Sequence, residues 1–229
     1  MFPNDRSKSF CLFIKGARTM SNYEIVALCF GIMTGLYLCY QAEKFRKKGN
    51  KKRELALKGG TTLTAALLAG YGYSLRPTPA HLMIMIGLFV CAVADVVLDR
   101  HFLAGTVAFG LGHICYCAAY LLSAGPGIGS LILFLVMAGL MIILYPKLKQ
   151  FSAPDSALPY LGYALLISAM LALALPQKTM LLAGAALFVA SDCMLLYRMI
   201  RKLPSRAYDY ICLGAYFLAQ FLIAASTLL

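Results

Sequence analysis

Eight long apolar segments run along almost the whole chain, and they restrict its fold more than any other feature. They lie at about 23–40, 59–75, 80–99, 102–124, 128–145, 157–175, 179–199 and 207–229. Each is close to the roughly 20 residues that an α-helix needs to cross a bilayer. In hydrocarbon every backbone polar group needs a partner within the protein, which leaves helices and closed barrels. Because the apolar residues do not alternate with polar ones, we predict helices.

The composition also indicates a protein that lies in the lipid bilayer. Of 229 residues, 61% are hydrophobic and 13% are charged, whereas a soluble domain carries about 25% charged residues. The predicted fold class is therefore all-α: a polytopic integral membrane protein, a bundle of about eight transmembrane helices. We divide the chain into a basic N-terminal extension, residues 1–22, and an eight-helix transmembrane domain, residues 23–229.

The net charge of +12 follows the loops between the apolar segments. We interpret it as contact with membrane lipids and expect no nucleic-acid partner. The loops after the first, third, fifth and seventh segments hold 15 of the 21 Lys and Arg, whereas the opposite side holds Arg76 and Lys178. Because positive loops stay in the cytoplasm, both termini should face away from it. The four basic residues in 1–19 favour the reverse orientation. The expected location is a bacterial inner membrane or a eukaryotic endomembrane.

The cysteines and histidines predict neither a disulfide framework nor a metal centre. No C-x-x-C motif occurs among the eight Cys, and most lie inside apolar segments, where Cys behaves as a small hydrophobe. His81 and His101 flank opposite ends of the third segment, so they cannot readily converge with His113 on one ion. We expect no metal and no cofactor, and the sequence does not reveal the oligomeric state.

Two of the nine acidic residues, Asp95 and Asp192, lie well inside predicted membrane helices. An ionisable side chain in a membrane costs several kcal/mol and usually marks function. Both helices run toward the cytoplasm and place the aspartate one to two turns, roughly 6–10 Å, from that end. The alternative is structural: each aspartate makes an interhelical hydrogen bond or ion pair.

Further polar residues share helix faces with this region. Tyr116 follows His113 at i+3 in the fourth segment, and Tyr216 and Gln220 are four residues apart in the eighth. Such pairs lie on one face of a helix. Lys58 begins the second segment, where it can extend to the interface or pair with an aspartate. For His113 the alternative of an ordinary hydrogen-bonded core residue stays open.

Several motifs, in order, resemble the lysoplasmalogenase family, the YhhN-type multi-pass membrane proteins. They are Ala94-Asp95-x-x-Leu98, Phe109-x-x-x-His113-x-x-Tyr116, Gly184-Ala-x-Leu-Phe-x-x-Ser191-Asp192-x-x-Leu195 and Tyr216-x-x-Ala219-Gln220-x-Leu222. Lys58 and Tyr163 match further family positions, and the resemblance covers about 23–229. One departure is Ala94, where the family usually has Gly, and its methyl group could crowd the approach to Asp95.

The resemblance implies an ether hydrolase. It would cleave the vinyl ether of a lysoplasmalogen, a lysophospholipid substrate within the bilayer, to a fatty aldehyde and glycerophosphoethanolamine or glycerophosphocholine. It implies catalytic roles for Asp95, Asp192 and His113. The implied substrate-binding residues are Lys58, near the phosphate, and Tyr116, Tyr163, Ser191, Tyr216 and Gln220.

The chemistry of a vinyl ether suits two carboxyl groups. The outer vinyl carbon must receive a proton, and water must then attack the carbon that bears oxygen. One carboxyl group can stay protonated as the acid, while the other stays charged to stabilise the cation or activate water. The sequence does not say which aspartate takes which role.

Two other classes of function stay open. Two intramembrane acids and a His also suit a proton-coupled transporter or lipid flippase. The motif small-Asp-x-x-Leu occurs at 94–98 and again at 191–195, as an internal repeat or by chance. A structural membrane protein is the third alternative. A serine esterase is disfavoured because no G-x-S-x-G motif is present.

Overall fold

The computed structural model describes residues 21–151, 157–201 and 206–229. Within these ranges the chain is all-α, which confirms the predicted fold class. The helices are α2 (Asn22–Lys47), α3 (Lys51–Leu75), α4 (Pro79–Leu98), α5 (Phe102–Ser123), α6 (Ile128–Phe151), α7 (Ala157–Ala174), α8 (Thr179–Arg201) and α9 (Arg206–Ala225), followed by a 3-10 turn, η1 (Ser226–Leu228).

Six of these helices, α2, α4, α5, α6, α8 and α9, are long and apolar enough to cross a membrane. The apolar part of α7, Leu158–Ala174, is shorter. Although α3 is long, it begins with a charged turn and continues through Gly and Thr residues. Much of α3 is buried against other helices, so α3 need not be apolar along its whole length to lie within a membrane. The chain is thus a multi-pass integral membrane protein, as predicted.

The basic segment 41–58, predicted to be mostly loop, is mostly helical instead. Only three residues, 48–50, separate α2 from α3, and Gly49 makes the turn with φ +69°, a backbone conformation that favours Gly. Ion pairs at helical spacing extend both helices beyond their apolar parts: Glu43 with Arg46 at 2.9 Å and Glu54 with Lys58 at 3.4 Å. Sequence hydropathy finds only the apolar part of such a helix.

Most other boundaries agree with the local sequence signals. Ser21 and Glu24 form a reciprocal capping box at the start of α2. Thr78 caps α4, whose first residue is Pro79. Pro146 differs from the prediction, because it lies inside α6 rather than beyond its end.

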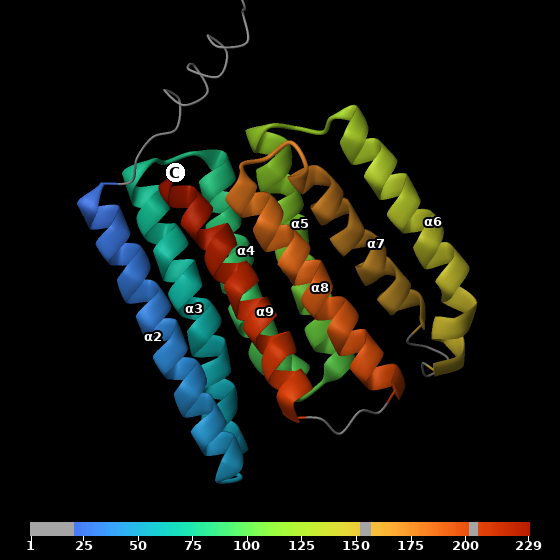
Figure 1. Cartoon of the computed structure of the whole chain (residues 1–229), viewed down its shortest axis with the longest axis horizontal. Helices are drawn as coiled ribbons and strands as arrows, with labels where there is room; N and C mark the ends of the chain where they lie inside the picture. Colours follow the sequence, from blue (N-terminus) through green and yellow to red (C-terminus); the bar gives the residue numbers. More distant parts are fainter. Residues whose placement is uncertain (1–20, 152–156, 202–205) are drawn as a thin grey trace, which may run out of the picture.

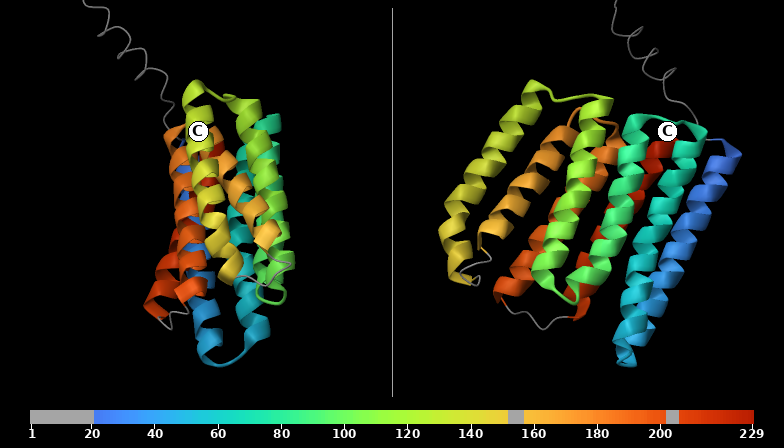
Figure 2. Two further views of the ribbon diagram at one scale, coloured as in Figure 1. Left: turned by 90° about the vertical axis from the view of Figure 1, so that its right-hand side faces the viewer. Right: turned by 180° about the vertical axis from the view of Figure 1, so that it is seen from behind.

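Six helices form a ring, and two lie outside it. Contacts join α3 to α4, α4 to α5, α5 to α7, α7 to α8, α8 to α9, and α9 back to α3. Outside this ring, α2 packs on α3 and α6 packs on α7, and these two helices form opposite edges of the bundle (Figures 1 and 2). Consecutive helices alternate in direction, so α4 and α8 run parallel (Figure 1).

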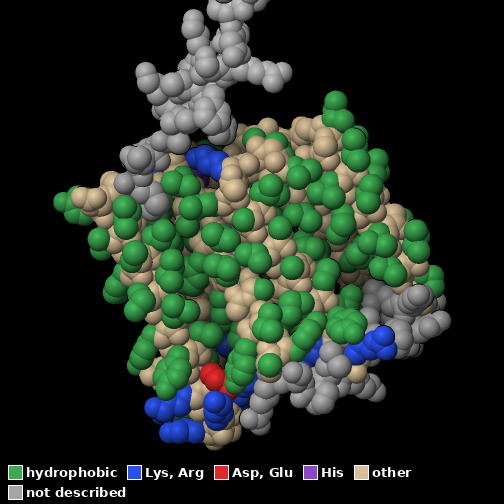
Figure 3. Space-filling model, in the orientation of Figure 1, with side chains coloured by type: hydrophobic (Ala, Val, Ile, Leu, Met, Phe, Trp, Pro, Cys, Tyr) green, Lys and Arg blue, Asp and Glu red, His purple; other side chains and the backbone are tan. Residues whose placement is uncertain are grey.

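The surface is that of a protein surrounded by lipid. Apolar side chains cover most of the face seen in Figure 3, and Lys and Arg gather mainly at the end where α2 joins α3. This distribution matches the charge asymmetry on which the predicted orientation rests. That this end faces the cytoplasm stays a prediction.

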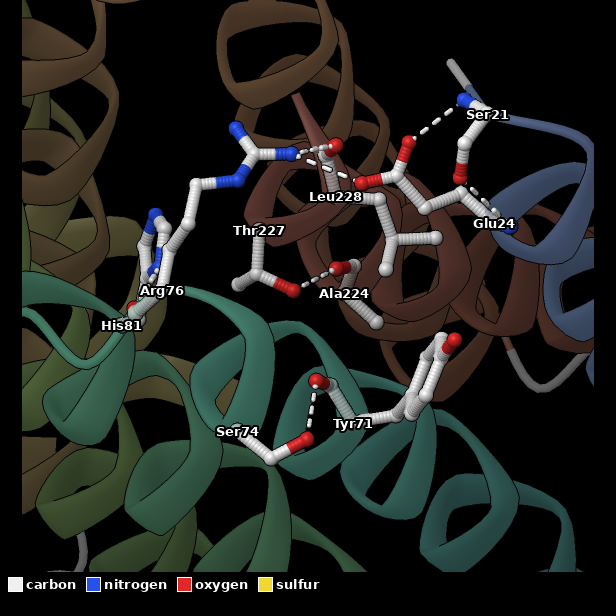
Figure 4. Close-up of polar contacts among 9 residues, drawn as sticks. All are labelled: Ser21, Glu24, Tyr71, Ser74, Arg76, His81, Ala224, Thr227 and Leu228. Carbon is white, nitrogen blue, oxygen red and sulfur yellow. Dashed lines mark hydrogen bonds and ion pairs between the residues drawn. The ribbon is translucent and has the colours of Figure 1, made fainter.

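An ion pair between a half-buried arginine and a buried carboxylate joins segments at the opposite end of the bundle (Figure 4). The Arg76 guanidinium lies 3.0 Å from Glu24 Oε1 and also donates to the carbonyl oxygen of Leu228. Glu24 is only 2% exposed. Arg76 follows α3, Glu24 is in the first turn of α2, and Leu228 is in η1. One side chain therefore joins three segments.

We expect Arg76→Met to destabilise the protein strongly, because it removes a cation from the buried Glu24 carboxylate. Breaking a buried pair from one side costs about 3–5 kcal/mol, or roughly 10 °C in Tm for a chain of this size. Thermal unfolding in detergent measures the change. Arg100→Met, at an exposed position, is the control, and the double variant Glu24→Gln/Arg76→Met should regain part of the loss. An unchanged Tm would contradict this role.

Candidate active site

Asp95 is the end of a chain of hydrogen bonds inside the helix ring. Its Oδ2 accepts hydrogen bonds from the Thr62 hydroxyl and, at 3.0 Å, from the Tyr216 hydroxyl. Asp95 lies one turn before the end of α4 and is half-buried. Both donors fix one oxygen of the carboxyl group, and they leave its other oxygen for a different partner.

The chain continues away from Asp95 through buried side chains. Gln220 Nε2 donates to the Tyr216 hydroxyl oxygen at 3.0 Å, and the Tyr116 hydroxyl donates to Gln220 Oε1 at 2.8 Å. All donors therefore point in one direction, from Tyr116 through Gln220 and Tyr216 to Asp95. Buried polar networks of this kind are rigid when every member is satisfied. The pairing of Tyr216 with Gln220 agrees with their predicted shared face.

Asp192 on α8 has a separate donor. The Tyr163 hydroxyl of α7 donates to Asp192 Oδ2 at 2.6 Å, and Asp192 is half-buried. The neighbouring Ser191 turns away from this pair, since its hydroxyl donates to the carbonyl oxygen of Cys212 at 3.0 Å. Ser191 thus joins α8 to α9, and its predicted contact with substrate stays a prediction.

His113 lies in an aromatic cluster between the two aspartate groups. Its ring is edge-on to Phe188, with ring centroids 4.5 Å apart, and to Tyr163 at 5.5 Å. Phe188 in turn lies 5.4 Å from the Tyr216 ring. Rings therefore connect the donor of Asp192, through His113 and Phe188, to the donor of Asp95.

The two ring nitrogens of His113 have different surroundings. Nδ1 lies 2.7 Å from the carbonyl oxygen of Phe109. A carbonyl only accepts, so Nδ1 carries the proton and Nε2 has a free lone pair. Nε2 is buried and has no hydrogen-bond partner among the described residues. An unpaired buried acceptor is costly, so this atom is a candidate to bind water or substrate.

Every helix of the ring contributes to this region. The contributors are Thr62 of α3, Asp95 of α4, His113 and Tyr116 of α5, Tyr163 of α7, Asp192 of α8, and Tyr216 and Gln220 of α9. Seven of the nine predicted site residues are thereby brought into one connected region, and Lys58 and Ser191 are not. In the described part of the chain, no group of three His, Cys, Asp or Glu is placed to hold a metal ion.

Lys58 pairs with acids other than the two aspartates. Its Nζ lies 2.9 Å from Asp99 Oδ2 and 3.4 Å from Glu54 Oε1. Lys58 is one helical turn before Thr62 on α3. The group of Lys58, Glu54 and Asp99 therefore lies just beyond the Asp95 end of the hydrogen-bond chain. The structure therefore does not contain the predicted alternative, an ion pair of Lys58 with Asp95 or Asp192.

Sequence reasoning missed Thr62 and the packing role of Gly87. Thr62 is fully buried, and its signal was available, since a Gly-Gly-Thr-Thr run is unusually polar for a membrane helix. A side chain at Gly87 would lie 2.6 Å from the Tyr116 ring, so this Gly lets α4 approach α5 closely. Ala94, which precedes Asp95, is completely buried.

The chain is similar to known proteins over most of its length. The family model described as the YhhN family matches residues 54–227. A human protein named Lysoplasmalogenase TMEM86B is 31% identical over 170 residues, which are 72% of this chain and 73% of the human protein. No solved structure matches. The residues around both aspartates, from Thr62 to Gln220, all lie within the matched range.

Proposed function

The chain belongs to the YhhN family, and from that premise we propose that it hydrolyses the vinyl-ether bond of lysoplasmalogens. The products are a fatty aldehyde and glycerophosphoethanolamine or glycerophosphocholine. The named human relative supports the activity. The observation that supports it best is that ring contacts link the tyrosine donors of two half-buried carboxyl groups to His113. The Nε2 of His113 is buried and has no hydrogen-bond partner among the described residues.

We assign the two aspartates different roles from their hydrogen bonds. Asp95 accepts two hydrogen bonds, and donors to a carboxyl group favour its charged form. Asp192 accepts one. Asp192 is therefore the acid that protonates the outer vinyl carbon, and Asp95 is the carboxylate that stabilises the resulting oxocarbenium ion.

Water completes the reaction at the carbon that bears oxygen. His113 Nε2 accepts a proton from the attacking water, and a hemiacetal forms. As the hemiacetal collapses, the C–O bond to glycerol breaks, and the imidazolium returns its proton to the departing glycerol oxygen. The hemiacetal hydroxyl gives its proton to Asp192, which restores the acid. One water is consumed, and no oxidant or reductant is needed.

The remaining predicted residues hold this arrangement or contact substrate. Tyr216 donates to Asp95, and Gln220 and Tyr116 orient Tyr216. Tyr163 holds Asp192. Lys58 already has two carboxylate partners, and its contact with the phosphate stays a prediction from the sequence. The transporter alternative has no support among the relatives described above.

Purified protein in detergent, without any ion gradient, should convert a lysoplasmalogen to aldehyde and glycerophosphodiester, which mass spectrometry detects. A transporter or a structural protein would leave the lipid intact under these conditions. The double variant Asp95→Asn/Asp192→Asn, purified identically, is the control for contaminating hydrolases. Intact lipid with a well-folded wild-type chain would contradict the proposed function.

A further inference from the structure

A charged cavity of about 190 Å³ lies at the basic end of the bundle, apart from the aspartate region. Glu43, Arg46 and Lys47, at the end of α2, line it together with Asp209, in the first turn of α9. The cavity therefore presents two cations and two carboxylates. It is next to the α2–α3 turn, beyond the apolar parts of the helices, where phospholipid headgroups lie.

These charges are held in a defined array. Arg46 Nε lies 2.9 Å from Glu43 Oε2, and the Tyr210 hydroxyl donates to the other oxygen of Glu43. The Arg46 guanidinium also lies 5.3 Å from the centre of the Tyr210 ring. Asp209 is 2.8 Å from Arg198 Nε. The charged residues that line the cavity, from α2 and α9, are thus held by contacts with one another, with Tyr210 and with Arg198 of α8.

The balance of charge distinguishes this cavity from the surroundings of Lys58. Lys58 is one cation between two carboxylates, so an arriving phosphate meets a net negative group. At the cavity, two cations, Arg46 and Lys47, balance two carboxylates, Glu43 and Asp209. The array can accept a phosphate and still offer a carboxylate to an ammonium group.

The cavity is also at a suitable distance from the aspartates. Asp209 and Tyr216 are seven residues apart on α9, which places them on one face and about 10 Å apart along the axis. Tyr216 is the residue that donates to Asp95. In an extended lysophospholipid the ether oxygen lies roughly 6 Å from phosphorus and roughly 10 Å from the amine nitrogen, from bonds of about 1.5 Å. A headgroup in the cavity thus brings the ether to the level of Asp95.

We propose that this cavity binds the zwitterionic headgroup of the lysophospholipid substrate. The phosphodiester lies toward Arg46 and Lys47, and the ammonium lies toward Glu43 and Asp209. This assignment rests on the proposed function for the identity of the lipid. It adds the place at which the headgroup is recognised, and it predicts that zwitterionic substrates bind more tightly than anionic or uncharged ones.

The test uses a lipid that cannot be cleaved, so that binding is measured without turnover. The probes are a saturated-ether lysophosphoethanolamine, the matching lysophosphatidic acid analogue, which lacks the amine, and the matching alkylglycerol, which lacks the headgroup. Each is titrated into the purified full-length chain in detergent, and the rise in Tm gives an apparent Kd. The wild type should bind the headgroup lipid more tightly. Arg46→Ala/Lys47→Ala should weaken its binding by about tenfold, and Glu43→Gln should remove the preference for the zwitterion over the lysophosphatidic acid analogue.

Lys51→Ala/Lys52→Ala is the matched control, since it removes the same charge from exposed residues at the same end. Equal affinity of the wild type for the lysophosphoethanolamine and the alkylglycerol would overturn the proposal, and so would an equal loss in the control pair. A larger loss in Lys58→Ala than in the cavity pair would place the phosphate at Lys58 instead. If the double variant does not fold, Glu43→Gln and Lys47→Ala carry the test separately. Selective binding without cleavage of a lysoplasmalogen would refute the hydrolase and leave the cavity assignment standing.

Discussion

Asp95→Asn and Asp192→Asn should each lower kcat/KM for a lysoplasmalogen by at least about 10²-fold, the range typical of a general acid or base. Asn keeps the size of the side chain and can still accept from Thr62, Tyr216 or Tyr163 through its carbonyl oxygen. It can neither deliver the proton nor carry the negative charge. Steady-state kinetics in detergent measure the loss, with size-exclusion profiles as the check that each variant folds.

The double variant should be little worse than the worse single variant, because groups that act as one unit are not additive. If the aspartates only joined helices, both Asn variants would keep their activity, because the hydrogen bonds would survive. Full activity in both would therefore disprove the site assignment.

His113→Leu should reduce kcat by about 10²-fold, through loss of the base that accepts a proton from water. Leu fills similar space against Phe188, so the aromatic cluster should persist. Tyr120→Phe is the matched control: Tyr120 is fully buried on the same helix, and its hydroxyl has no hydrogen-bond partner in the described part of the chain. We expect Tyr120→Phe to keep wild-type kcat. Equal loss in both variants would indicate a packing effect rather than a role for Nε2.

The sequence was sufficient for the fold because the bilayer leaves few alternatives. Helix positions follow from apolar segments of the required length, and prolines such as Pro79 mark their ends. The extension of α2 to Lys47 was missed, because ion pairs rather than hydropathy continue the helix there. Pro146 was misassigned, since one proline near the end of a helix removes few hydrogen bonds.

The site was predictable in its residues but not in its connections. Asp95 and Asp192 were identifiable because a charge in a membrane helix is costly. Tyr163 donates a hydrogen bond to Asp192, and Tyr216 donates one to Asp95. These pairings depend on how the helix ring closes, with α9 against α3 and α7 against α8. Spacing within one helix carries no information about that closure. The pairing of Lys58 with Asp99 was missed for the same reason, since Lys58 is on α3 and Asp99 is at the end of α4.

Turnover of a lysoplasmalogen in isotopically labelled water tests the central claim, protonation at carbon followed by attack of water, most directly. In heavy water, the account predicts one deuterium on the α-carbon of the aldehyde, when the reaction is quenched before exchange. In ¹⁸O-water, it predicts that the label enters the aldehyde, read after immediate reduction to the alcohol, and is absent from the glycerol. Label in the glycerol oxygen would mean that water attacks the other carbon, and that result would contradict the mechanism.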